Sequence, residues 1–159
     1  MMLHDSNKLR GLRLYQIDFF RTPFDVAHDY NNMTQEDKDK LSSFDIYASF
    51  DYEDEFNNYI ILFLTTQPII DKYKIMLFNN VIPNITKDIS QNVISYNIDL
   101  SENLEKHRTK KNSKKLTEFQ NNLDIWIESN LDLDKVLDMI NEKGMECLKK
   151  AHLNFLKKI

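Results

Sequence analysis

The sequence predicts an α+β fold, in which an N-terminal antiparallel sheet of about five strands packs against C-terminal helices. Before about residue 100 apolar residues mostly alternate with polar ones, and after it they recur every three or four residues. Alternation is typical of half-buried strands, and the longer spacing is typical of amphipathic helices. A run of strands followed by a run of helices is the pattern of α+β proteins.

Five segments carry the strand pattern: residues 12–20, 44–51, 58–66, 73–78 and 93–100. Residues 44–51 alternate most regularly, which indicates one buried face and one wet face. Residues 58–66 are apolar on both faces, as expected of a central strand. Together these two segments predict a hairpin with the sequence YEDE near its tip. Between the first two strands, residues 22–32 are predicted to form a turn-like region. After them we expect a short helix that is capped by Thr34.

The second part of the chain carries helical signals. We expect a short helix or an irregular crossover over residues 80–91, and a helix from Ser101 that either breaks at KKNSKK or continues through it. A clear amphipathic stripe follows, made of Leu116, Phe119, Leu123 and Trp126. The next helix is capped by Asp132 or Asp134, has an apolar face of Leu133, Val136, Leu137 and Ile140, and stops at Gly144. Leu148, Phe155, Leu156 and Ile159 form one side of a last helix.

Length and composition limit the class of protein. The chain has 159 residues, 42% of them hydrophobic and 29% charged, which predicts a single domain over residues 1–159, strand-rich over 9–100 and helical over 101–159. Only two glycines occur, which disfavours phosphate sites whose backbone needs glycine. The net charge of -4 gives no overall attraction to nucleic acid or to anionic lipid.

The sequence also predicts where the protein works. The single cysteine, Cys147, forms neither an internal disulfide nor a thiolate metal site by itself, which fits a reducing compartment. The N-terminus lacks the continuous apolar region of a signal peptide, and the longest apolar run, residues 59–64, is too short to span a membrane. We therefore expect a cytoplasmic protein without a membrane partner.

One local resemblance lies at the C-terminus, where residues 133–159 consist of an apolar helix, a glycine and a second apolar helix. This segment, about a sixth of the chain, resembles a short tail at the end of some bacterial rhomboid-family membrane proteins and of other bacterial proteins. The segment differs from that tail at the start of the second helix, where Cys147 and Lys149 replace the tail's pair of capping residues. The resemblance implies a bacterial origin and no catalytic activity. The matching residues are Val136, Leu137, Ile140, Gly144, Leu148, Phe155 and Leu156.

The first candidate site is an acidic cluster formed by Asp51, Glu53, Asp54 and Glu55. A Ca²⁺ loop needs a glycine for its sharp turn, and there is none here. Acid/base chemistry needs carboxylates that are partly removed from water, whereas a hairpin tip is wet. We interpret the cluster as a solvated turn that also discourages edge-to-edge sheet pairing, with a contact surface for a basic partner as the functional alternative.

The second candidate is a basic segment made of Lys106, Arg108, Lys110, Lys111, Lys114 and Lys115. Such a run either follows a phosphate backbone or forms a solvated helix face. It lacks the interleaved aromatic residues on which single-stranded bases stack. The four histidines show no metal-binding spacing and are interpreted as surface residues. Cys147, near a helix start and two lysines, is either a small buried side chain or a reactive thiol.

No catalytic constellation, metal site or cofactor site is apparent. We therefore predict a small non-enzymatic binding protein of bacterial or phage origin, of the immunity, antitoxin-like or adaptor type, that uses charged surfaces to bind a protein partner. The alternative is a nucleic-acid-associated protein that uses the basic segment. A second copy of the chain is a further partner that the sequence leaves open, and an enzyme with a site assembled in space is the third class.

Overall fold

The sheet has four antiparallel strands in the described part of the chain. The computed structural model describes residues 9–42, 46–66, 70–71, 83–95 and 98–158. The strands are β1 (Arg13–Asp18), β2 (Ala48–Glu53), β3 (Tyr59–Thr65) and β4 (Ile85–Asp88), in the order β2-β3-β1-β4. The α+β class is therefore confirmed, with four described strands instead of about five. The strand expected at residues 73–78 lies outside the described residues.

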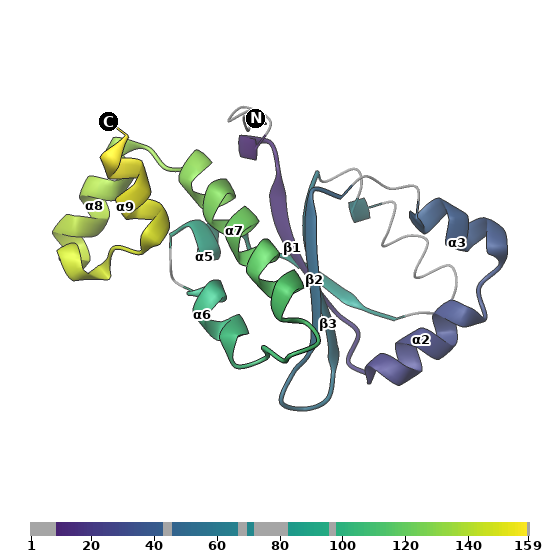
Figure 1. Ribbon diagram of the computed structural model, residues 1–159. Helices are drawn as coiled ribbons and strands as arrows, with labels where there is room; N and C mark the ends of the chain where they lie inside the picture. Colours follow the sequence, from purple (N-terminus) through teal and green to yellow (C-terminus); the bar gives the residue numbers. More distant parts are fainter. Residues whose placement is uncertain (1–8, 43–45, 67–69, 72–82, 96–97, 159) are drawn as a thin grey trace.

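Helices lie on both sides of this sheet (Figure 1). On one side are α2 (Pro23–Asn31) and α3 (Gln35–Ser42). On the other are α5 (Ser90–Ile94), α6 (Leu100–Glu105), α7 (Ser113–Ser129), α8 (Leu133–Lys143), the 3₁₀ turn η1 (Met145–Cys147) and α9 (Lys150–Lys157). The sequence predicted the C-terminal helices as a layer on the sheet, and of the helices on the other side it predicted α3 alone. No described helix is both long enough and apolar enough to cross a membrane.

The central strand explains the two helical layers, because both of its faces are apolar. Leu62 and Leu64 are fully buried in the core under α7, whereas Ile61 and Phe63 belong to a second core that includes Val26 of α2. A strand that is apolar on both faces must be covered on both to keep this surface from water. The predicted central strand is confirmed.

Helix α7 is the main element of the C-terminal layer. Its predicted stripe of Leu116, Phe119, Leu123 and Trp126 is buried, with each side chain at most 2% exposed. The indole Nε1 of Trp126 donates a hydrogen bond to the carbonyl of Leu12 at 3.2 Å, which satisfies its only polar atom inside the core. The stripe thus fixes α7 across the face of β1, β2 and β3.

The turn-like region predicted at residues 22–32 is instead α2, and that prediction is wrong. Thr22 caps this helix, because its Oγ1 accepts the N–H of Asp25 at 3.2 Å. Pro23 occupies the first helical position, where its missing N–H costs nothing. The apolar residue Val26 faces the sheet. A threonine–proline start was therefore a readable helix signal, and the predicted cap at Thr34 of α3 is confirmed.

The assignments for residues 80–100 are also wrong in part. Residues Ile85–Asp88 form β4, paired with β1, and the predicted strand at 93–100 is replaced by the end of α5 and the start of α6. Ser90 accepts the N–H of Leu14 at 2.8 Å and so anchors α5 to the sheet edge. In a short segment, the spacing of apolar residues fits a strand and a helix about equally well. Here pairing with β1 decides which of the two forms.

The boundaries of α8 agree with the predicted signals, whereas Leu148, predicted on the last helix, lies before α9. Asp132 caps α8 by accepting the N–H of Lys135 at 2.8 Å, and Gly144 ends it with φ of 85°. The expected apolar face is only partly used, because Val136 is buried while Leu133 and Leu137 are each 44% exposed. Helix α6 begins at Leu100 and is capped by Asp99, whereas the sequence predicted a helix from Ser101.

Candidate partner-binding surface

The acidic cluster lies on β2 and on the turn that follows it, as predicted. Within the turn, the N–H of Asp54 donates to the carbonyl of Asn58 at 2.9 Å. The Asp54 side chain closes the turn, since its Oδ1 accepts the N–H groups of Phe56 and Asn58, both at 2.9 Å. Asn57 takes the left-handed conformation, φ 64°, which asparagine tolerates better than most residues. The turn is therefore held by hydrogen bonds that the sequence specifies.

The four carboxylates have different roles in this geometry. Asp54 is half-buried and serves the turn, whereas Glu53 and Glu55 are exposed. Asp51 is also exposed and accepts a hydrogen bond from the Tyr59 hydroxyl at 2.9 Å. Phe56, the residue after Glu55, is 75% exposed at the tip. Because three of the four carboxylates are exposed, the cluster is a surface feature.

The basic segment contains one cation that belongs to the fold. Residues 106–112 form a break between α6 and α7, one of the two arrangements expected from the sequence. Arg108 lies inside this break and donates to the side chains of Glu105, Ser113, Thr117 and Gln120 at 2.7–3.0 Å. These bonds hold the pKa of the Glu105 carboxyl at about 2. The Arg108 guanidinium thus holds the loop between α6 and α7 in place. The sequence did not predict this role.

The remaining cations of the segment are exposed: Lys106, Lys110, Lys111, Lys114 and Lys115. They lie on the loop and the first turn of α7, beside the ordered Arg108. Asn112 fixes the same loop, accepting the N–H of Thr109 at 2.8 Å and donating to the carbonyl of His107 at 3.0 Å. Five lysines are therefore presented from a rigid corner, and Arg108 is not one of the available charges.

The hairpin and the basic corner meet, although the sequence predicted them as separate surfaces. The rings of Tyr52 and His107 lie 4.5 Å apart between centroids. Beside them is a cavity of about 350 Å³, whose lining includes Asp54 and Glu55 from the turn and Lys106 from the corner. Burial, together with the nearby carboxylates, raises the pKa of the Tyr52 phenol to about 12. Only the tertiary structure places these groups together.

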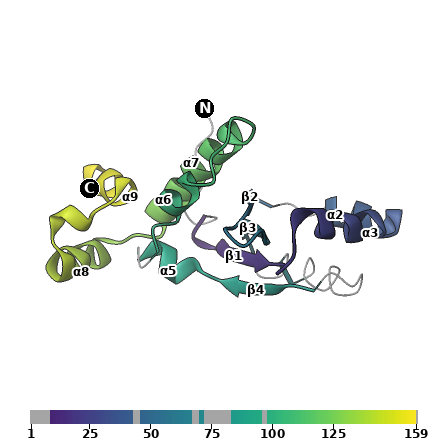
Figure 2. The same cartoon turned by 90° about the horizontal axis from the view of Figure 1, so that it is seen from below.

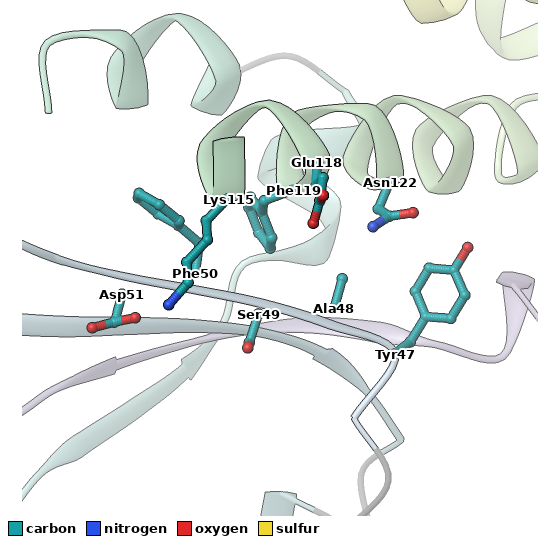
Figure 3. A pocket seen from close by; sticks show the side chains of 9 residues that line it. All are labelled: Tyr47, Ala48, Ser49, Phe50, Asp51, Lys115, Glu118, Phe119 and Asn122. Atoms are coloured by element: carbon teal, nitrogen blue, oxygen red, sulfur yellow. The ribbon is translucent and has the colours of Figure 1, made fainter. Parts of the chain in front are cut away.

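A second groove joins the same two elements further along β2 (Figure 3). It has a volume of about 340 Å³ and is lined by residues 47–51 and by Lys115, Glu118, Phe119 and Asn122 of α7. The Lys115 side chain extends from α7 toward β2, while Ser49 points away from α7. Asp51 and Lys115, taken from the two predicted charge clusters, therefore line one groove.

The described histidines, His28, His107 and His152, and Cys147 make contacts within the fold, whereas His4 lies outside the described residues. The interpretation of every histidine as a surface residue is wrong for His152, which is fully buried, and its Nδ1 accepts the N–H of Lys149 at 3.0 Å. The Nε2 of His28 lies 3.2 Å from the Nδ2 of Asn32. In the described structure His28 does not contact the carboxylates of the hairpin. Cys147 is half-buried with its Sγ 3.8 Å from the carbonyl of Met139. None of these side chains joins the charged surface except His107.

Comparisons with known proteins give no relative on which to base a function. No family model matches the chain, and no curated protein and no solved structure is similar to it.

Proposed function

We propose that the protein is a binding protein without catalytic activity, whose acidic hairpin contacts a basic segment of a partner protein. The observation that carries this proposal is the pre-formed turn, which presents Phe56, 75% exposed, next to Glu55 and close along the chain to Glu53. An exposed aromatic side chain with charged neighbours is the usual composition of an interface anchor and its rim. Because Asp54 already orders the turn, binding does not have to order it.

The carboxylates supply orientation and speed of association rather than most of the affinity. Exposed ion pairs contribute about 0.2–1 kcal/mol each, and complementary charge raises the association rate. The apolar contact of Phe56 supplies the larger share when its ring is buried by the partner. This division predicts that neutralising the acids weakens binding in a salt-dependent way, whereas removing the ring weakens it at every ionic strength.

A peptide-display selection tests the proposal. The intact protein is offered a random peptide library, and the enriched peptides are then measured against Asp51→Asn/Glu53→Gln/Glu55→Gln and against Phe56→Ser. We expect enriched peptides of net positive charge that bind both variants more weakly. Asp54 is left unchanged because it holds the turn. Failure to enrich any basic peptide, or equal binding by all variants, contradicts the proposal.

The second candidate function, binding of nucleic acid, is favoured by the five exposed lysines on the corner after α6. It is opposed by the nearby carboxylates of Asp54 and Glu55, which share a cavity with Lys106. Fluorescence anisotropy with labelled single-stranded and double-stranded oligonucleotides at low salt tests it. Binding that falls steeply as the salt concentration rises, and that is lost in Lys110→Glu/Lys111→Glu/Lys114→Glu, supports this function. If the anisotropy of neither oligonucleotide rises at low salt, this function is ruled out.

A further inference from the structure

The outer edge of β2 carries backbone groups that pair with no other strand in the described part of the chain. Among the described strands β2 lies at one edge of the sheet, as the view in Figure 2 shows. Asp54 and Asn58 are a hydrogen-bonded pair, and the same register continues through Tyr52 and Ile60. Neighbouring residues of an antiparallel strand direct their N–H and C=O groups to opposite edges. The N–H and C=O groups of Ser49, Asp51 and Glu53 therefore point outward.

A groove runs beside this open edge. It is lined by Tyr47, which precedes β2, by residues 48–51 of β2, and by residues one and two turns apart on α7, ending at Asn122 (Figure 3). A free strand edge next to a helix is the arrangement in which proteins accept an extended peptide as an additional strand. The volume, about 340 Å³, is at the lower end of the usual range for ligand sites, which suits a few side chains of such a peptide.

The two faces of an added strand meet different chemistry. On the face away from α7 its side chains lie opposite Asp51 and Glu53, both exposed. On the α7 face they lie in the groove, whose lining includes the rings of Phe50 and Phe119, 6.0 Å apart and each at most 3% exposed, together with Lys115, Glu118 and Asn122. Opposite charges in cross-strand pairs are stabilising, and apolar side chains favour the aromatic side. The complementary strand therefore alternates basic and apolar residues.

A second copy of this chain is a poor occupant of the edge. Antiparallel pairing of two β2 strands brings the Asp51 and Glu53 carboxylates of one copy near those of the other. Like charges directly opposite each other are destabilising. The same acids that discourage self-pairing favour a basic strand, so the edge selects its partner by charge.

We propose that the edge of β2, with the groove under α7, receives an extended segment of a partner protein as an additional antiparallel strand, in which basic residues alternate with apolar ones. This inference rests on the proposed function and names the form that the basic partner takes. Antiparallel addition continues the pattern of every described strand pair in the sheet. In this arrangement the N–H groups of the basic peptide residues face β2, and those of the apolar residues face solvent.

Backbone amide exchange, measured with the peptide acetyl-Lys-Val-Lys-Val-Lys-Val-Lys-amide, tests the strand pairing. In the free protein the amides of Ser49, Asp51 and Glu53 exchange rapidly because they face solvent. With saturating peptide we expect their exchange to slow by roughly tenfold or more, while the amides of Lys106, Lys110 and Lys111, which lie outside the groove, keep their rates. Binding without this protection overturns the strand addition but leaves the proposed function standing.

Modified peptides separate backbone pairing from simple charge attraction. Methylating the backbone nitrogens of the lysine residues should abolish binding, because these N–H groups face β2. Methylating the backbone nitrogens of the valine residues should leave binding unchanged, because these N–H groups face solvent. A block peptide, Lys-Lys-Lys-Lys-Val-Val-Val, has the same composition without alternation and should bind at least about tenfold more weakly. Equal binding of both methylated peptides, or of the block peptide, contradicts the proposal. If neither alternating nor block peptide binds and library selection also fails, the proposed function fails with it.

Protein variants complete the test. Ser49→Pro removes one outward N–H without breaking a bond to β3, and Ser49→Ala is its matched control. We expect the proline variant alone to lose peptide binding, with the fold checked by the fluorescence of Trp126. In Asp51→Lys/Glu53→Lys the preference should reverse toward a Glu-Val alternating peptide, whereas retained preference for the Lys-Val peptide overturns the assigned face.

Discussion

Tyr52 of β2 and His107 of the loop after α6 are in ring contact, 4.5 Å between centroids. This contact joins the hairpin to the C-terminal helical layer at the point where the acidic and basic clusters meet. It is continued by Phe50, whose ring lies 6.3 Å from Tyr52 and 6.0 Å from Phe119 of α7. A line of aromatic rings therefore connects the exposed surface with the core, and it determines how firmly the hairpin is held.

A double-mutant cycle measures this contact. Tyr52→Leu and His107→Gln are each expected to destabilise the protein, and the double variant less than the sum of both, with a coupling energy of about 0.5–1.5 kcal/mol. Urea unfolding followed by Trp126 fluorescence gives the free energies. Tyr52→Phe keeps the ring and should keep the coupling. Additive single changes would show that the two rings are neighbours without mutual stabilisation.

The turn prediction concerns Asp54, which accepts two backbone N–H groups. Asp54→Ala leaves both donors without this acceptor and should cost about 1–2 kcal/mol. Asp54→Asn retains the oxygen and should cost less than half as much. Glu55→Ala, in the same turn but exposed, should remain within about 0.5 kcal/mol of the parent in urea unfolding. A large loss in Glu55→Ala would contradict the division of roles among the acids.

We predict that Arg108 contributes to the stability of the fold and that Lys110 does not. Arg108→Met removes the donors that hold the loop and should lower the melting temperature, whereas Lys110→Met should leave it nearly unchanged. The Glu105 carboxyl has its pKa lowered from 4.5 to about 2, so its contribution to stability is present above about 4.5 and is lost as pH falls toward 2. The parent should therefore lose stability across this window more steeply than Arg108→Met. High salt should shrink the difference, because the pair is exposed.

The buried His152 predicts a pH dependence nearer neutrality. Burial lowers the pKa of its imidazole, so the folded protein prefers the neutral ring. Stability should be full above the unfolded value near 6.5 and should fall as pH drops below it, because the unfolded chain then binds the proton. The slope from this residue is at most about 1.4 kcal/mol per pH unit. Thermal melts of His152→Gln between pH 5 and 8 should lack this slope, and an unchanged slope would assign it to another group.

Parts of the fold follow directly from local patterns. The stripe from Leu116 to Trp126 is long and regular, so its helix and its buried face were predictable, as were the cap at Asp132 and the stop at Gly144. The hairpin between β2 and β3 was equally readable, since alternation on one side and a fully apolar run on the other leave one arrangement. Residues 85–100 were not readable, because their isoleucines fit a strand and a helix about equally well.

The sequence by itself determined which side chains carry charge, where the hairpin turns and which helical face is apolar, because these depend on residues close together in the chain. The tertiary structure decided what each charge does. It placed Arg108 inside a loop, buried His152, set Tyr52 on His107 and put β2 beside α7 at an edge of the described sheet. Such roles depend on groups brought together from distant parts of the chain by packing on the sheet, and no local pattern records those partners.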